Sequence, residues 1–138
     1  MKVCFPLKLS AALPFAICGL DALLDPQPHR ERAAHLTAPA EALGLKPLRG
    51  KDTDRLTRLT GALLIAGSAA LVRNSGPVRA AGFALAALQI PLALANNPFW
   101  TYADSGQRRH CFVRCVNHLG PAAAALLVGK AAAKSVKK

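Results

Sequence analysis

Four long apolar runs, separated by segments that hold nearly all of the charge, constrain this chain more than any other feature. They are Val3–Leu24, Leu59–Val72, Ala80–Ala95 and Cys111–Gly129. A helix needs about 20 mostly apolar residues to cross a bilayer, with a working range of about 17–25. The first and fourth runs have this length, and the second and third reach it when flanking residues join them. The pattern therefore predicts an all-α fold, a four-transmembrane-helix bundle.

The alternative is a soluble, alanine-rich helical bundle. Charged residues make up only 18% of the chain and hydrophobic residues 52%, whereas a soluble domain carries about 25% charged residues. Ala80–Ala95 has Gln89 as its one polar side chain, and Leu59–Val72 offers only Thr60 and Ser68. A helix on the surface of a soluble protein would show a polar stripe at helical spacing. Because these runs lack one, the composition favours a membrane protein.

The 138 residues suffice for a single membrane domain. We expect spans over about residues 4–24, 57–72, 78–97 and 111–129, a long loop over 25–56 and a basic tail over 130–138. The first run is interrupted by Pro6 and Lys8 and no small-x-small cleavage site follows it, so we interpret it as a retained span. In the long loop, Ala33, Leu36 and Ala40 recur at helical intervals. This spacing predicts a short helix that lies on the membrane surface or caps the bundle.

Charge density predicts the orientation. Four spans place both termini on one side, where segments 1–8, 73–79 and 129–138 hold eight Lys or Arg in 25 residues and no acid. The opposite segments, 25–58 and 96–110, hold nine Lys or Arg and six acids in 49 residues. Lys and Arg concentrated next to short loops mark the cytoplasmic side. We therefore predict N-in and C-in, with an extracytoplasmic long loop and a cytoplasmic basic tail.

The net charge of +11 could indicate a nucleic-acid-binding protein. Such proteins place their cations on one helix face or among stacking aromatic residues, whereas here cations sit at the ends of the apolar runs. These residues are Lys2, Lys8, Arg73, Arg79, Lys130, Lys134, Lys137 and Lys138. Cations beside a membrane that face anionic lipid explain them. The expected partner is the lipid bilayer, and no nucleic acid is expected.

Small residues recur at helical spacing in the later spans. They are Ala62, Ala66 and Ala70 in the second, Gly82 and Ala86 in the third, and Ala122 onward in the fourth. Helices in lipid associate through close packing of small residues, since hydrophobicity does not distinguish protein from lipid tails. The spacing predicts a compact bundle with these residues at the helix contacts.

Arg114 stands four residues into the fourth apolar run. An arginine at the centre of a membrane helix costs about 2.5–3.5 kcal/mol on insertion scales, but one near a helix end can extend its charge to the interface. A second interpretation pairs Arg114 with Asp21. The first and fourth spans are antiparallel, and each residue lies about three positions from a span end in the same leaflet, so a rise of 1.5 Å per residue puts both near one depth.

Other polar residues of this leaflet complete a candidate cluster with a neighbouring aromatic wall. The cluster comprises Asp21, Arg114, His118, Asn117, Cys18, Cys111 and Cys115, and the wall comprises Phe99 and Trp100. The Cβ atoms of Cys111 and Cys115 would be about 5–6 Å apart, too far for a disulfide, whereas Cys18 could bridge either. The chain has no Cys-x-x-Cys motif and no recognised zinc spacing. We therefore predict no metal site and no resident cofactor, with a quinone as the ligand that the cluster could take.

Several of these stretches resemble the DoxX family of small bacterial membrane proteins. They are PFAICGLDALLDP (Pro14–Pro26), RLTGALLIAGSAALV (Arg58–Val72), NPFW (Asn97–Trp100) and FVRCVNHLG (Phe112–Gly120). The resemblance gives Asp21 the charged position that closes the first span. It gives Phe99 and Trp100 the aromatic pair after the third, and Phe112 and Arg114 the Phe and Lys positions that open the fourth. Two positions depart from the family pattern, because Cys115 replaces a usual Asn and Gly120-Pro121 a usual Gly-Gly.

The resemblance implies a four-helix integral protein of the bacterial cytoplasmic (inner) membrane. Some family members are linked to thiosulfate:quinone oxidoreductase or to membrane-bound thiol and oxidative-stress systems. On this basis we expect an accessory or anchoring subunit of a membrane-associated redox system, not catalytic alone, with a soluble or membrane redox protein as its partner.

Two alternatives stay open. One is a quinone-binding component of an oxidoreductase, with Asp21, Arg114 and His118 as polar contacts and Trp100 as a wall. The other is a small-molecule or lipid transporter, with kink points at Pro14, Pro91 and Pro121. The chain lacks the inverted repeat of many transporters, though a homo-oligomer could supply the symmetry.

Overall fold

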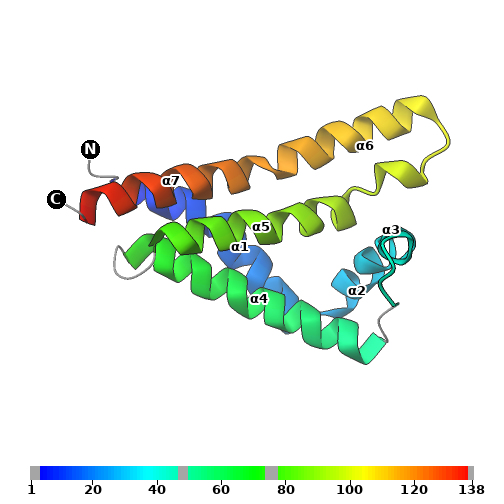
Figure 1. Ribbon diagram of the computed structural model, residues 1–138, viewed down its shortest axis with the longest axis horizontal. Coiled ribbons are helices and arrows are strands. Elements are labelled where there is room, and N and C mark those ends of the chain that lie inside the picture. The colour runs from blue at the N-terminus through cyan, green and yellow to red at the C-terminus, as the bar shows by residue number, and fades with distance from the viewer. Residues whose placement is uncertain (1–3, 47–49, 74–77, 137–138) are drawn as a thin grey trace.

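The computed structural model describes residues 4–46, 50–73 and 78–136, and the side chains of these as far as residue 132. Every regular element in this part of the chain is helical (Figure 1). In order they are α1 (Phe5–Leu24), α2 (Gln27–Ala34), α3 (Thr37–Ala42), α4 (Gly50–Arg73), α5 (Val78–Asn96), the 3-10 helix η1 (Phe99–Thr101), α6 (Ser105–His118) and α7 (Gly120–Val136). The predicted all-α class is confirmed.

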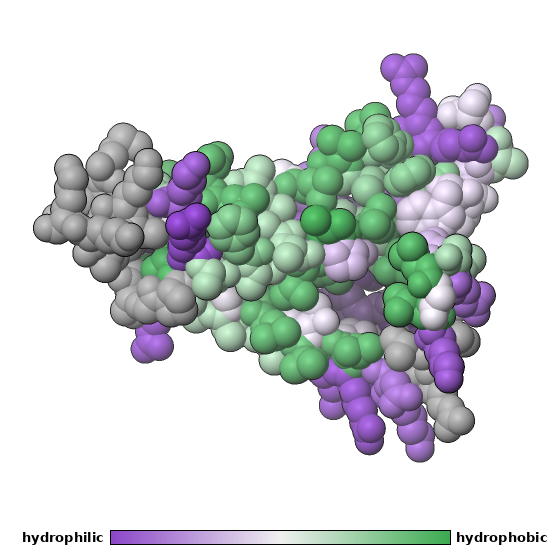
Figure 2. Space-filling model, in the orientation of Figure 1, coloured by the Kyte–Doolittle hydropathy of each residue, from purple (hydrophilic) through white to green (hydrophobic). Residues whose placement is uncertain are grey.

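The four long apolar segments form a closed ring, in which α1 packs on α4, α4 on α5, α5 on α7, and α7 on α1. Four helical stretches are long and apolar enough to cross a membrane: Phe5–Leu24, Gly50–Arg73, Val78–Thr101 and Ser105–Ala132. The N- and C-terminal ends lie together at one end of the molecule, and α2 and α3 lie at the other (Figure 1). Hydrophobic side chains cover the middle of the visible face, and hydrophilic ones gather towards the ends (Figure 2). This is a four-helix bundle of a multi-pass membrane protein.

Two of the long helices begin earlier than the apolar runs predict. The helix α4 starts at Gly50 rather than near residue 57, and α6 starts at Ser105 rather than near 111. Asp104 caps α6, because its carboxylate accepts a hydrogen bond of 2.7 Å from the Gln107 backbone N–H. Asp52 lies in the first turn of α4, where a negative charge favours the helix dipole. Both helices thus extend beyond their apolar lengths into polar sequence.

The fourth apolar segment is two helices rather than the one predicted over residues 111–129. It is interrupted at Leu119, between α6 and α7. Pro121 has no N–H to donate to the preceding turn, so the helical ladder cannot run through it. Pro14 and Pro91 instead lie within the continuous helices α1 and α5. Of the three proposed kink points, only Pro121 divides its helix.

The helix pairs α1–α4 and α5–α7 approach closely at glycines. A Cβ on Gly19 of α1 would lie 2.7 Å from the Gly61 carbonyl oxygen of α4, and a Cβ on Gly61 would lie 2.7 Å from that of Gly19. Likewise, a Cβ on Gly82 of α5 would lie 2.6 Å from the backbone oxygen of Ala125, and one on Gly129 of α7 would lie 3.0 Å from that of Val78. Any larger residue at these crossings would separate the two backbones.

The predicted contact positions in the second span are wrong. Ala62 and Ala66 are exposed and Ala70 is only half-buried, because the packed face of α4 is a different one. It comprises Gly61, Leu64, Ser68 and Leu71. In the other spans, Gly82, Ala86 and Ala122 are buried as predicted.

The largest buried side chains form the core where the four helices meet. They include Phe15, Leu64, Leu71 and Leu85, each at most 1% exposed. Ser68 adds a polar contact to this core, because its hydroxyl lies 2.7 Å from the Leu64 carbonyl oxygen and 3.2 Å from that of Ala12 on α1. Lys8 is also buried, at 5% exposure. It therefore does not face lipid as its place in the sequence predicts.

We expect Gly82→Ala to lower the free energy of unfolding by about 1–3 kcal/mol, the usual cost of overpacking a close contact. The added methyl group meets backbone atoms of Ala125 and Gly129, which cannot move aside as a side chain could. Gly120→Ala is the matched control, because a Cβ there has nothing within 4 Å. Unfolding titrations in mild detergent measure the stability of both variants. Equal stability would contradict the close backbone contact between α5 and α7 at Gly82.

Candidate functional site

The predicted polar cluster is divided between two places in the structure. Asp21 and Cys18 lie on α1, whereas Arg114 and the other members lie on α6. The neighbours of α1 are α4 and α7, and those of α6 are η1, α5 and α7. The Asp21 carboxylate lies 2.9 Å from Nε2 of His29 on α2. Arg114 is exposed and makes no hydrogen bond or ion pair within the described residues.

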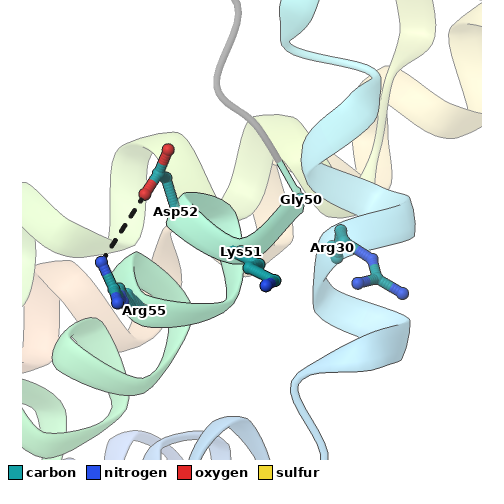
Figure 3. Close-up of a pocket in the computed structure, with 5 residues that line it drawn as sticks. All are labelled: Arg30, Gly50, Lys51, Asp52 and Arg55. Carbon is teal, nitrogen blue, oxygen red and sulfur yellow. Dashed lines mark ion pairs between the residues drawn. The ribbon is translucent and has the colours of Figure 1, made fainter.

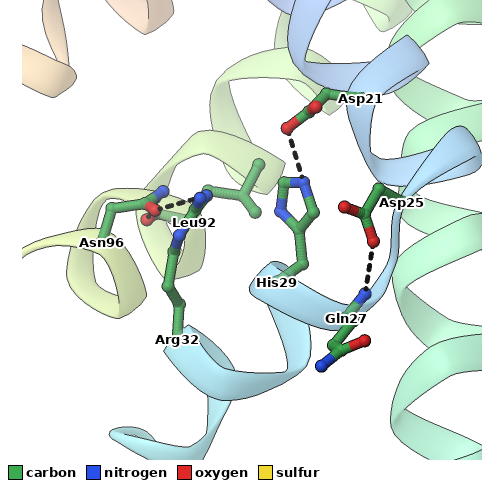
Figure 4. A network of polar contacts seen from close by, with 7 residues as sticks. All are labelled: Asp21, Asp25, Gln27, His29, Arg32, Leu92 and Asn96. Carbon is green, nitrogen blue, oxygen red and sulfur yellow. Dashed lines mark hydrogen bonds and ion pairs between the residues drawn. The ribbon is translucent and has the colours of Figure 1, made fainter.

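The predicted Asp21–Arg114 ion pair is therefore wrong. Equal depths would bring the two residues together only along straight antiparallel helices, and α6 is a separate helix that packs beside η1 and α5. In addition, the segment treated as a loop contains α2, which presents His29 to Asp21 (Figure 4). The exposed position of Arg114 fits the other interpretation, a side chain that extends to the interface.

His118 ends α6 and contacts α5 through two side chains. Its Nδ1 lies 2.6 Å from Nδ2 of Asn97, and its backbone oxygen accepts a hydrogen bond of 2.9 Å from Gln89 Nε2. Asn97 is 1% exposed and also donates to the Ala93 carbonyl oxygen at 2.9 Å. These bonds hold the helix break at Leu119 against α5. The sequence predicted His118 as a site residue but did not identify Asn97 as its partner.

The aromatic wall packs across the connection between α5 and α6. Phe99 and Trp100 are half-buried and meet edge-to-face, with ring centroids 5.1 Å apart. Phe99 makes a second edge-to-face contact of 5.3 Å with Phe112 of α6. Such pairs contribute about 0.5–1.5 kcal/mol beyond their burial. The wall therefore fixes the middle of α6 relative to η1.

All four cysteines are free thiols. Cys115 is buried and Cys111 is half-buried, while Cys4 and Cys18 are exposed. Cys18 has not joined either cysteine of α6, so the disulfide that the sequence allowed is not formed. Asn117, the remaining member of the predicted cluster, is exposed.

The helix α2 is held to three of the long helices by side-chain contacts, which the sequence did not predict. His29 contacts Asp21 of α1, Arg30 donates to Asp54 of α4 at 3.2 Å, and Arg32 donates to Asn96 of α5 at 3.3 Å. Figure 4 shows the first and last of these contacts on one side of α2. The helix has no buried residue, so polar contacts rather than apolar packing hold it in place.

A cationic depression lies where α2 meets the start of α4 (Figure 3). It has a volume of about 590 Å³ and is lined by Arg30, Gly50, Lys51, Asp52 and Arg55. A smaller depression of about 250 Å³ adjoins it, and shares the lining residues Lys51 and Arg55. We refer to the two together as the α4 depression.

A signal for the α4 depression exists in the sequence. Lys51, Arg55 and Arg58 are spaced four and three residues apart, which places them on one face once the segment is helical. The prediction of a loop over residues 25–56 concealed that spacing. Arg30 joins this face from α2, about twenty residues earlier in the chain, and only the folded structure shows that neighbourhood.

We refer to the end of the bundle formed by α2, α3 and the start of α4 as the polar end (Figure 1). The fold and the polar end together define an all-α integral membrane protein with four spans and a small polar helix packed across one end of the bundle. No protein-family model, curated protein or solved structure matches the chain.

We expect Asn97→Ala to destabilise the protein by about 1–3 kcal/mol, because it removes the hydrogen bonds that the buried Asn97 amide makes to the His118 imidazole and the Ala93 carbonyl oxygen. Asn117→Ala is the matched control at an exposed position, where substitutions usually change stability by less than about 0.5 kcal/mol. Unfolding in mild detergent measures both. A loss as large for Asn117→Ala would contradict the structural role of Asn97.

We also expect the double substitution His29→Ala and Arg32→Ala to release α2 from α1 and α5 without unfolding the bundle. Each lost hydrogen bond is worth about 0.5–1.5 kcal/mol, so amide hydrogen exchange in α2 should accelerate by about 10- to 100-fold. Glu31→Ala with His35→Ala is the control, since both side chains are exposed on the same segment. Unchanged exchange in the first variant would show that something else holds α2.

Proposed function

We propose that this chain is a DoxX-like membrane protein that serves as an accessory or anchoring subunit for a membrane-associated redox system. One observation carries the proposal: two of the polar residues expected to form a ligand site between spans, Asp21 and His118, are used to join helices. Asp21 holds α2, and His118 holds α5. The groups left for a partner therefore lie at the polar end of the bundle.

The polar end offers a surface suited to a partner protein. Outward-facing charged and polar side chains of α2 and α3 include Glu31, His35 and Glu41, all exposed. The contacts of His29, Arg30 and Arg32 with three long helices hold this surface in a defined position. A pre-positioned surface loses less conformational entropy when a partner binds.

The membrane and the orientation belong to the same proposal. We place the chain in the bacterial cytoplasmic (inner) membrane with both termini in the cytoplasm. The orientation follows from the high density of Lys and Arg in segments 1–8, 73–79 and 129–138. The polar end would then face the extracytoplasmic side, and its partner would be a redox protein that is soluble there or embedded beside it.

The test compares donor-dependent quinone reduction in membranes that lack the chain and membranes that contain it. We expect wild-type protein to restore the activity and the variant Glu31→Ala, His35→Ala, Glu41→Ala to restore it poorly, with both proteins present at equal amounts. Arg73→Ala, at the opposite end of α4, is the control and should restore it fully. The purified chain alone should show no quinone reduction.

Three results would overturn the proposal. Bound quinone in the purified chain, with donor-dependent reduction by that chain alone, would make it a quinone-binding oxidoreductase component. Substrate counterflow in vesicles that contain only this chain would make it a transporter. Membrane activity that does not depend on the chain would remove the redox association.

A further inference from the structure

The α4 depression carries more positive charge than its own acids neutralise. Four cations line it, Arg30, Lys51, Arg55 and Arg58, against the two carboxylates of Asp52 and Asp54. Asp54 accepts a hydrogen bond from Arg30 at 3.2 Å, and Asp52 lies 3.9 Å from Arg55. Within the described residues, Lys51 and Arg58 are in no ion pair. The depression therefore has a net charge of about +2.

Cations from two helices line this depression. Lys51 and Arg55 extend from the first turns of α4, and Arg30 comes from α2 across the junction (Figure 3). Arg55 is 84% exposed and its pairing distance of 3.9 Å is long, so Asp52 compensates it weakly. An anion in this space would meet an ammonium and a guanidinium that are both accessible. Guanidinium and ammonium groups are the usual partners of phosphate oxygens.

The depression lies at the N-terminal end of α4, one of the four helices long and apolar enough to cross a membrane. Leu56, Leu59 and Leu63 of the same helix are 44–56% exposed in the isolated chain, as side chains that face lipid would be. Lys51 precedes Leu59 by eight residues, about 12 Å at the helical rise of 1.5 Å per residue. Leu43 and Leu45, which follow α3, are 80% and 61% exposed. Exposed apolar side chains suit a segment that lies in the headgroup region.

We propose that the α4 depression binds the phosphate group of an anionic phospholipid headgroup, held chiefly by Lys51 and Arg55. The net positive charge, the two accessible donors and the position above lipid-facing leucines all favour this ligand. The proposal requires only that the chain resides in a membrane. It is independent of the redox partner proposed above.

The experiment uses full-length protein in mild detergent and native mass spectrometry with phosphatidylglycerol or phosphatidylcholine as the added lipid. We expect wild-type protein to retain phosphatidylglycerol preferentially, and Lys51→Gln with Arg55→Gln to bind it about 30-fold more weakly. This figure follows because each Lys or Arg near an anionic surface contributes about fivefold. Lys51→Arg should bind as wild type does, which would show that the cation rather than the lysine itself is needed.

The matched control is Arg73→Gln with Lys130→Gln, which removes the same charge from exposed positions at the other end of the spans. It should retain phosphatidylglycerol, and thermal unfolding of every variant identifies any that has lost its fold. Equal loss in the control would overturn the proposal in favour of general charge attraction. Binding of inorganic phosphate that displaces the lipid completely would overturn the lipid assignment in favour of a soluble phosphate ligand. No preference for phosphatidylglycerol by wild-type protein would also overturn it.

Discussion

The rest of the structure depends on the close approach of backbones at two glycine crossings. Gly19 meets Gly61 between α1 and α4, and Gly82 meets Gly129 between α5 and α7. In a membrane the hydrophobic effect cannot select these contacts, so the gain comes from van der Waals packing that only small residues allow. The two helix pairs so formed then join through larger side chains, such as Leu85, which packs over Gly67 of α4.

Polar side chains act at the ends of this packed ring and at its helix break. Pro121 interrupts the fourth span, and Asn97 and Gln89 bind His118 beside the interruption. A broken helix in a membrane must have its freed backbone groups satisfied by neighbours, and Gln89 does this for the His118 carbonyl oxygen. At the end of the bundle where α2 lies, Asp21 holds that polar helix.

The fold class could be predicted from the sequence, since the length of four apolar runs determines how many helices can span a bilayer. Which face of each helix packs against its neighbours was harder to predict. Ala62, Ala66 and Ala70 have helical spacing, but the packed face of α4 lies one position away at Gly61. Alanine is abundant on every face of these spans, so spacing alone does not select one. The prediction of the Asp21–Arg114 pair was wrong for a different reason. The two residues were matched by their depth along their helices, but depth does not determine which helices are neighbours.

Arg30 connects the two features of the polar end. On α2 it donates to Asp54 and so fixes that helix to α4, and it also lines the α4 depression. The other oxygen of Asp54 is buried without a hydrogen-bond partner, which leaves this carboxylate incompletely satisfied and its bond to Arg30 the main compensation for its charge. An anion in the depression would attract Arg30 away from Asp54, or would share it. The hold of α2 on α4 and the charge of the depression therefore cannot vary independently, and the polar end is a single electrostatic unit.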